Sequence, residues 1–261
     1  MQERNRIVVK VGTSTVCHPN GAPNLRRLEK LCRTISDLNN TGHEIILVTS
    51  GAIGVGTRKM GLSHRPATIS GRQAAAAIGQ CELMSIYDRL FMDYGSLSGQ
   101  ILLTKDITED ETGKQNVIAT LRALLEMKAV PIVNENDSVA TEEIVYGDND
   151  TLSAVVAIFA EADVLVILSD IEGLYDSDPA SNPDAKLISI VRDYDKAHQA
   201  ASGSHSEHGT GGMITKIHAA SIAREAGIPT VLASGTDPAI LYDICDGVPA
   251  GTLFTVEGEN E

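Results

Sequence analysis

The sequence IVVKVGTS at residues 7–14 decides how the rest of the chain is interpreted. It is an apolar run with one charged residue, Lys10, and it ends in a glycine and two hydroxyl residues. A buried ammonium group is costly unless an anion pairs with it, and a glycine turn brings backbone N–H groups close to an anion. The stretch therefore predicts a buried strand whose end presents a cation to a negatively charged ligand. The alternative is a strand-end lysine whose ammonium group reaches solvent.

Five further apolar runs have the length of strands, and helical patterns lie between them. Strands are expected at 6–11, 44–49, 99–103, 130–133, 163–168 and 228–232, and helices at 24–41, 70–94, 114–128, 150–161 and 212–226. This alternation predicts an α/β fold with a mainly parallel central sheet covered by helices on both faces. Ligands of such sheets bind beyond the carboxyl ends of the strands. No repeat or linker divides the chain, so we expect a single domain over residues 1–261.

Composition argues against several classes of function. The 261 residues carry a formal net charge of -14, which argues against a nucleic-acid binder because phosphate backbones require a basic surface. The four cysteines are scattered without a C-x-x-C pair, so we expect reduced thiols and a cytoplasmic protein. No apolar run has the length of a membrane span, and the first six residues lack the apolar segment of a signal peptide.

Polar and glycine-rich segments follow the predicted strands. The run that ends at Val48 continues as TSGAIG over residues 49–54, and the run that ends at Val133 continues as NENDS over residues 134–138. The sequence GDND at residues 147–150 then opens a predicted helix. Asparagine and aspartate side chains gathered there can bind an ammonium or amide-like group of a small polar substrate. Simple helix capping is the alternative for the residues just before the helix.

Two later segments suit a nucleotide. Ser169 and Asp170 follow one predicted strand, and the glycine-rich sequence GTGGMITK at residues 209–216 ends with Lys216, one turn into a predicted helix. Backbone N–H groups at a helix start and an ammonium group bind phosphate oxygens. This segment is not a P-loop, because the G-K-[ST] order is absent, and the earlier residues 49–54 lack the spacing of a dinucleotide fingerprint. With two lysines and no metal-ligand cluster, these strand ends predict phosphoryl transfer, which depends on positioning and charge neutralisation.

Taken together, these motifs resemble the amino-acid kinase family. The resemblance rests on VKVGTS at 9–14, VTSGAI at 48–53, VNEND at 133–137, GDND at 147–150, SDIEGLY at 169–175 and GTGGMITK at 209–216, so it covers essentially the whole chain. It implies a three-layer α/β/α sandwich that uses ATP and Mg²⁺. It also implies transfer of the γ-phosphoryl group to the side-chain carboxylate of L-glutamate, the first step of proline biosynthesis.

The resemblance also implies roles for individual residues. Lys10 and Lys216 would hold the transferring phosphoryl group, and Asp150 would hold and orient both lysines. The residues implied in glutamate binding are Ser50, Asp137 and Asn149. Those implied in ATP binding are Lys10, Ser169, Asp170, Thr210, Gly211, Gly212, Met213, Ile214, Thr215 and Lys216. No general base is needed, because a glutamate carboxylate with a reference pKa of about 4.3 is already ionised at neutral pH.

Two other interpretations stay open at the level of sequence. One is a kinase of another small acid or phosphate, such as N-acetylglutamate, aspartate, carbamate or a nucleoside monophosphate, although Asp137 and Asn149 favour a substrate with a free α-ammonium group. The other is a non-catalytic sensor of glutamate or proline, which need not keep both lysines. Many family members carry a C-terminal PUA domain, which we do not expect here. We do expect a homo-oligomer, with proline as a candidate feedback inhibitor.

Overall fold

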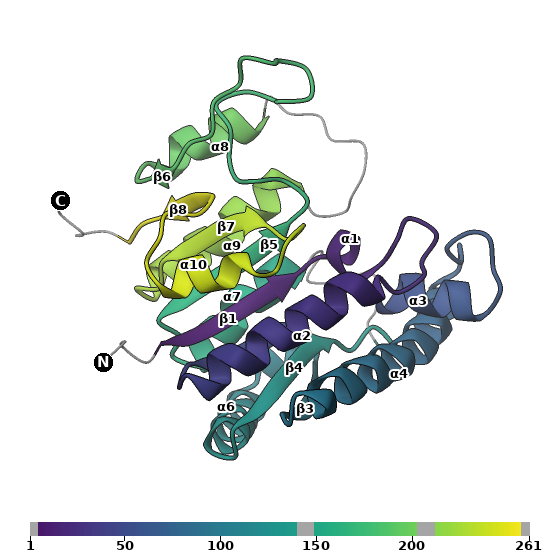
Figure 1. The fold of residues 1–261 in the computed structure, drawn as a ribbon. Helices are drawn as coiled ribbons and strands as arrows, with labels where there is room; N and C mark the ends of the chain where they lie inside the picture. The colour runs from purple at the N-terminus through teal and green to yellow at the C-terminus, as the bar shows by residue number, and fades with distance from the viewer. Residues whose placement is uncertain (1–4, 140–148, 203–211, 257–261) are drawn as a thin grey trace.

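A computed structural model of the chain describes residues 5–139, 149–202 and 212–256. These residues form an eight-stranded sheet with the strand order β3-β4-β2-β1-β5-β7-β8-β6 (Figure 1). The strands are β1 (Arg6–Val11), β2 (Glu44–Val48), β3 (Leu97–Leu103), β4 (Ala129–Glu135), β5 (Val164–Ser169), β6 (Ile190–Val191), β7 (Thr230–Ser234) and β8 (Thr252–Phe254). Neighbouring strands are parallel except β7 and β8, which are antiparallel. The predicted mainly parallel sheet is confirmed.

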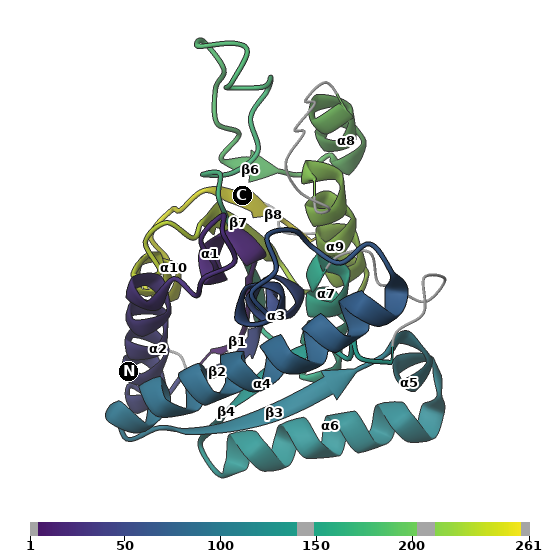
Figure 2. The same cartoon turned by 90° about the vertical axis from the view of Figure 1, so that its right-hand side faces the viewer.

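Helices cover both faces of this sheet (Figures 1 and 2). One face is covered by α1 (Thr13–Val16), α2 (Leu25–Asn40), α3 (Ala52–Lys59), α4 (Ile69–Asp93) and α10 (Ile240–Cys245), and the other by α6 (Glu111–Glu126), α7 (Asn149–Phe159), α8 (Tyr194–Ser202) and α9 (Met213–Glu225). The short α5 (Lys105–Glu109) precedes α6. The three-layer α/β/α sandwich is therefore confirmed. None of the described helices is both long and apolar enough to cross a membrane.

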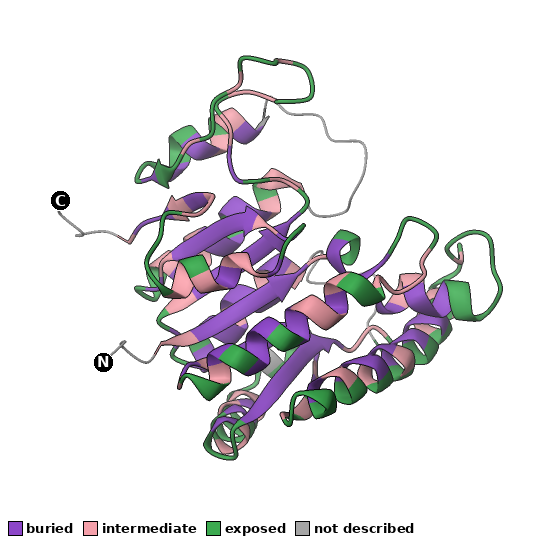
Figure 3. Cartoon of the chain, in the orientation of Figure 1, coloured by how far each residue is buried: buried purple, intermediate pink, exposed green. Residues whose placement is uncertain are grey.

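The alternation of side chains along β1 decides which face receives its charged residue. Ile7, Val9 and Val11 belong to the buried cluster under α2, whereas Val8 belongs to the cluster under α7 and α9. Successive side chains of a strand point to opposite faces of the sheet. Lys10 therefore shares the face of Val8, and it is buried. Strand β1 is buried beyond its first residue (Figure 3).

The elements that the sequence did not predict are short. They are α1, α3, α5, α8, α10, β6 and β8, and β6 has only two residues. Hydrophobic periodicity needs a longer window to be recognised. The strand expected at 228–232 lies two residues later, at Thr230–Ser234, because Ile228 is buried in the connection before the strand and extends the apolar run.

Helices α3 and α4 cross with their backbones in contact. A Cβ atom added to Gly56 would lie 1.7 Å from the carbonyl oxygen of Ala75, and one added to Gly79 would lie 1.8 Å from that of Ala52. Only glycine permits this approach at either position. Gly51 is the N-cap of α3 and has a φ of 96°, so it turns the chain sharply after β2. The small residues of α4 thus place this long helix close to the end of the sheet.

Candidate active site

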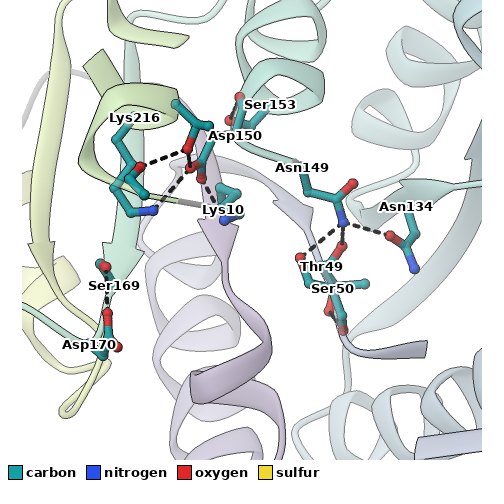
Figure 4. Close-up of polar contacts among 12 residues, drawn as sticks. Lys10, Thr49, Ser50, Asn134, Asn149, Asp150, Ser153, Ser169, Asp170 and Lys216 are labelled. Carbon is teal, nitrogen blue, oxygen red and sulfur yellow. Dashed lines mark hydrogen bonds and ion pairs between the residues drawn. The ribbon is translucent and has the colours of Figure 1, made fainter. Parts of the chain in front are cut away.

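Two lysines that are far apart in the sequence meet at one carboxylate. Lys10 Nζ lies 2.5 Å from Asp150 Oδ1, and Lys216 Nζ lies 3.1 Å from Asp150 Oδ2 (Figure 4). Asp150 is completely buried, and Lys10 and Lys216 are only 4% and 7% exposed. We call these three side chains the charged cluster. Together they carry one net positive charge, so the cluster is suited to an anionic ligand.

The positions of three elements explain this convergence. The lysine of β1 points to the face of the sheet covered by α7 and α9. Asp150 is the second residue of α7, where the helix dipole favours a negative charge, and Lys216 is the fourth residue of α9. The hydroxyl of Thr215 also donates a hydrogen bond of 3.0 Å to Asp150 Oδ2. The carboxylate is therefore held by groups from β1 and from the first turn of α9.

Glycines leave space beside the ammonium groups. A Cβ atom at Gly12 would lie 3.8 Å from Lys10 Nζ, so the missing side chain of Gly12 leaves room next to that cation. Gly212 is the N-cap of α9 and would have no described atom within 4 Å of an added Cβ. Backbone N–H groups at a helix start bind phosphate oxygens. The arrangement fits a phosphate group between the two lysines and the start of α9.

A chain of three side-chain amides lies beside the charged cluster. Asn149 Nδ2 donates to the Thr49 carbonyl oxygen at 2.6 Å, to Ser50 Oγ at 2.9 Å and to Asn134 Oδ1 at 2.8 Å (Figure 4). Asn134 Nδ2 in turn donates to Gln80 Oε1 at 2.8 Å. We call Gln80, Asn134 and Asn149 the amide relay. It connects α4, the end of β4 and the start of α7.

Asp137 lies further out, at a cavity of about 410 Å³ whose lining also includes Ala52, Ala76, Gln80 and Asn136. The Asp137 side chain is half-buried. Burial raises the pKa of its carboxyl, and the guanidinium of Arg65 opposes that shift. Asp137 is therefore a carboxylate whose charge is incompletely solvated, close to the amide relay.

The described residues among the others implied in ATP binding lie at the start of α9 and at the end of β5. Ser169 Oγ donates to Asp170 Oδ1 at 3.0 Å, and this pair lies on the Lys216 side of the site (Figure 4). Met213 packs against the core, whereas Ile214 is 51% exposed. Thr210 and Gly211 lie outside the described residues. Within the described residues, no three His, Cys, Asp or Glu side chains are grouped to hold a metal ion.

Comparison with known proteins shows the family of the chain. The profile of the amino acid kinase family matches residues 5–234. The chain belongs to the amino acid kinase family. Glutamate 5-kinase from Clostridium perfringens is 49% identical to it over 262 residues, which cover 98% of this chain and 97% of that protein.

Solved structures share the amino acid kinase fold at low sequence identity. UMP kinase from Bacillus anthracis superposes with a TM-score of 0.68 at 15% identity and covers 97% of both chains. Carbamate kinase from Giardia lamblia gives a TM-score of 0.69 at 13% identity, over 98% of this chain and 100% of that one. At these identities the likeness extends to the fold alone.

Two residues of this amino acid kinase site were not assigned from the sequence. Asn134 opens the polar segment after the strand expected at 130–133, which was a usable signal, and it lies near the end of β4. Gln80 had no such signal, because it is one polar residue at the end of an alanine-rich stretch of α4. Its partner Asn134 lies 54 residues away, so only the folded chain brings the two together.

Proposed function

We propose that the chain catalyses ATP-dependent phosphorylation of the side-chain carboxylate of L-glutamate, the first step of proline biosynthesis. The observation that carries this proposal is the charged cluster, in which two buried ammonium groups share a buried carboxylate next to the amide of Asn149. The 49% identity to a glutamate 5-kinase over nearly the full length of both chains supports the choice of substrate.

Lys10 and Lys216 are proposed to bind the oxygens of the transferring phosphoryl group. An oxygen of the substrate carboxylate attacks the γ-phosphorus, the bond to the β,γ-bridging oxygen breaks, and ADP leaves with the electron pair. The difficulty is electrostatic, because an anion attacks a polyanion, and buried cations offset that repulsion. Asp150 keeps both ammonium groups in place. Magnesium would add positive charge, held by phosphate oxygens and water rather than by a protein cage.

Ser50, Asn149 and Asp137 are proposed to bind the amino-acid end of glutamate. Ser50 Oγ accepts a hydrogen bond from Asn149, so its own proton is available to a substrate carboxylate. The oxygen of the Asn149 side chain and the carboxylate of Asp137 suit an α-ammonium group. An N-acetylated substrate lacks that charge, which disfavours it here.

The remaining assignments follow from the family. Ser169, Asp170 and the segment Thr210–Thr215 are proposed to bind ATP, with Lys10 and Lys216 at its terminal phosphate. Resemblance to the family also supports a cytoplasmic homo-oligomer that proline inhibits. Size-exclusion chromatography and addition of proline to the assay test the last two points.

A trapping experiment tests the proposed reaction. The protein is incubated with ATP, Mg²⁺ and hydroxylamine, which converts an acyl phosphate to a hydroxamate. We expect a hydroxamate with L-glutamate and little with N-acetylglutamate or aspartate. UMP and carbamate serve as further substrates, assayed by ADP release. ADP formation without a hydroxamate from any acid would contradict the proposal.

A further inference from the structure

We infer that Gln80 is a positioning residue for the amino-acid substrate. Its carbonyl oxygen holds Asn134, and Asn134 holds Asn149 so that the side-chain oxygen of Asn149 is presented to the substrate ammonium group. This inference rests on the proposed function. Gln80 also lines the cavity at Asp137, but its hydrogen bond to the relay is to Asn134, and it is assigned no direct part in the reaction.

Two main-chain groups identify which atom is the nitrogen and which is the oxygen in every amide of the relay. The Thr49 carbonyl oxygen can only accept, so the atom of Asn149 that lies 2.6 Å from it must be the nitrogen. The backbone N–H of Glu135 can only donate, so the atom of Asn134 that lies 2.9 Å from it must be the oxygen. The nitrogen of Asn134 then faces Gln80, which has to supply its oxygen as the acceptor.

This orientation leaves one atom of Asn149 for a ligand. Its nitrogen is shared among the Thr49 carbonyl, Ser50 Oγ and Asn134 Oδ1. Its oxygen points away from these three partners (Figure 4). An amide oxygen accepts hydrogen bonds, and an ammonium group donates them. The relay therefore presents an acceptor to the α-ammonium group of the substrate.

Helix α4 is placed to support the site from behind. Gly79 contacts the backbone of α3, so the next residue, Gln80, is brought to the end of β4. Two helical turns later, the hydroxyl of the buried Tyr87 lies 2.8 Å from Thr49 Oγ1. Residues seven apart lie on one face of a helix. One face of α4 therefore contacts the end of β4 through Gln80 and the residue after β2 through Tyr87.

The nitrogen of Gln80, which is buried without a partner among the described residues, indicates that this side chain does more than fill space. Gln80 is 8% exposed, and its Nε2 is buried with no hydrogen-bond partner among the described residues. A buried N–H group without a partner lowers stability. An apolar side chain of the same length would avoid that loss. The acceptor oxygen, which Asn134 uses, is the property that favours glutamine at this position.

The test compares steady-state kinetics of Gln80→Met with those of the wild type. Without the acceptor, the nitrogen of Asn134 loses its hydrogen bond and only its oxygen stays bonded. We expect the KM for L-glutamate to rise about tenfold, the effect of one hydrogen bond to a charged group. The kcat and the KM for ATP should stay within about twofold, since the charged cluster is unchanged. Gln115→Met is the control: Gln115 is an exposed glutamine of α6 that donates to Glu111, and the KM of this variant for glutamate should not change.

A double-mutant cycle separates positioning from a general structural effect. If Gln80 acts through Asn149, then Gln80→Met should change the glutamate KM little in an Asn149→Ala background. Additive effects, or an unchanged KM in folded Gln80→Met, would overturn the inference. Gln80→Leu repeats the test, and circular dichroism melting establishes that each variant is folded. A wild-type protein that makes no hydroxamate from glutamate would instead contradict the proposed function.

Discussion

The charged cluster and the amide relay start at adjacent residues of α7 but differ in chemistry. Asp150 turns to the face of the sheet covered by α7 and α9, where it pairs with Lys10 and Lys216. Asn149 turns to the ends of β2 and β4, and its partner Asn134 is held from the opposite face by α4. One helix start thus carries both a charged residue, proposed to act on the phosphoryl group, and an oriented amide, proposed to bind the amino acid.

The two regions also differ in what holds them together. The charged cluster is nearly excluded from water, and buried ions are tolerated only when they are paired well. The amide relay is neutral, and each of its bonds contributes about 0.5–1.5 kcal/mol in typical proteins. Changes in the charged cluster should therefore act strongly and on turnover, whereas changes around the relay should act moderately and on glutamate binding.

The largest expected effect is that of Lys10→Met on turnover. Methionine keeps most of the buried stem of Lys10, while Asp150 keeps its pair with Lys216, so the protein should stay folded. We expect kcat to fall about 1,000-fold, the upper range for loss of one group that stabilises charge in a transition state. Hydroxamate formation measures this fall.

A surface lysine provides the control for that experiment. Lys59 on α3 is exposed and paired with Glu82, so Lys59→Met should leave kcat unchanged. If the kcat of Lys10→Met stays within tenfold of the wild-type value, the charged cluster has no catalytic role. A rise in the glutamate KM without a fall in kcat would contradict the proposal that the charged cluster acts on turnover and the amide relay on glutamate binding.

An intermediate effect is expected where α3 and α4 cross. An added Cβ at Gly56 would meet the Ala75 carbonyl at 1.7 Å, so Gly56→Ala must push α4 away. We expect a stability loss of about 2 kcal/mol from overpacking, together with a higher KM for glutamate. Urea denaturation and kinetics measure the two quantities.

Helix α3 also offers a matched control, Gly54, where an added Cβ would have no described atom within 4 Å. Alanine is favoured over glycine inside a helix by about 1 kcal/mol, so Gly54→Ala should keep or raise stability. Equal destabilisation by the two substitutions would show that helix propensity, rather than the crossing, determines the result.

The smallest expected effect is a pH dependence that arises from Asp137. Burial raises the pKa of this carboxyl above its ordinary value of 3.8, with Arg65 opposing the shift. Only the ionised form pairs with an ammonium group, so glutamate binding should weaken as the pH falls, starting at a higher pH than for an ordinary aspartate. The pH profile of kcat/KM for glutamate measures this limb.

Asp137→Asn should remove that limb and leave only the titration of the substrate carboxyl, near about 4.3. A raised carboxyl pKa means that the folded state disfavours the charge, so this contribution lowers stability at pH values above the folded pKa. The same substitution should therefore raise the melting temperature at neutral pH while it weakens glutamate binding. Identical pH profiles in both proteins would exclude Asp137 as the titrating group.

Sequence reasoning located much of this site because its signals are local. Lys10 within an apolar run and the polar residues after Val48 and Val133 were recognisable by their position at strand ends. Gln80 was not, because a single glutamine near alanines is also typical of an ordinary helix surface. Its hydrogen bond depends on the close crossing of α3 and α4, which requires both helices to be in place.

Hydrophobic periodicity and turn residues act over a few neighbours, so the sequence alone predicts the alternation of strands and helices, the buried lysine and the polar segments at the strand ends. The folded chain was needed to show that Lys10 and Lys216 share Asp150 and that three amides are oriented in series. The two ion pairs of Asp150 join residues 66 and 140 positions apart, and the two bonds of the relay join residues 15 and 54 positions apart. Their geometry depends on which face of the sheet each side chain takes and on how closely the helices pack.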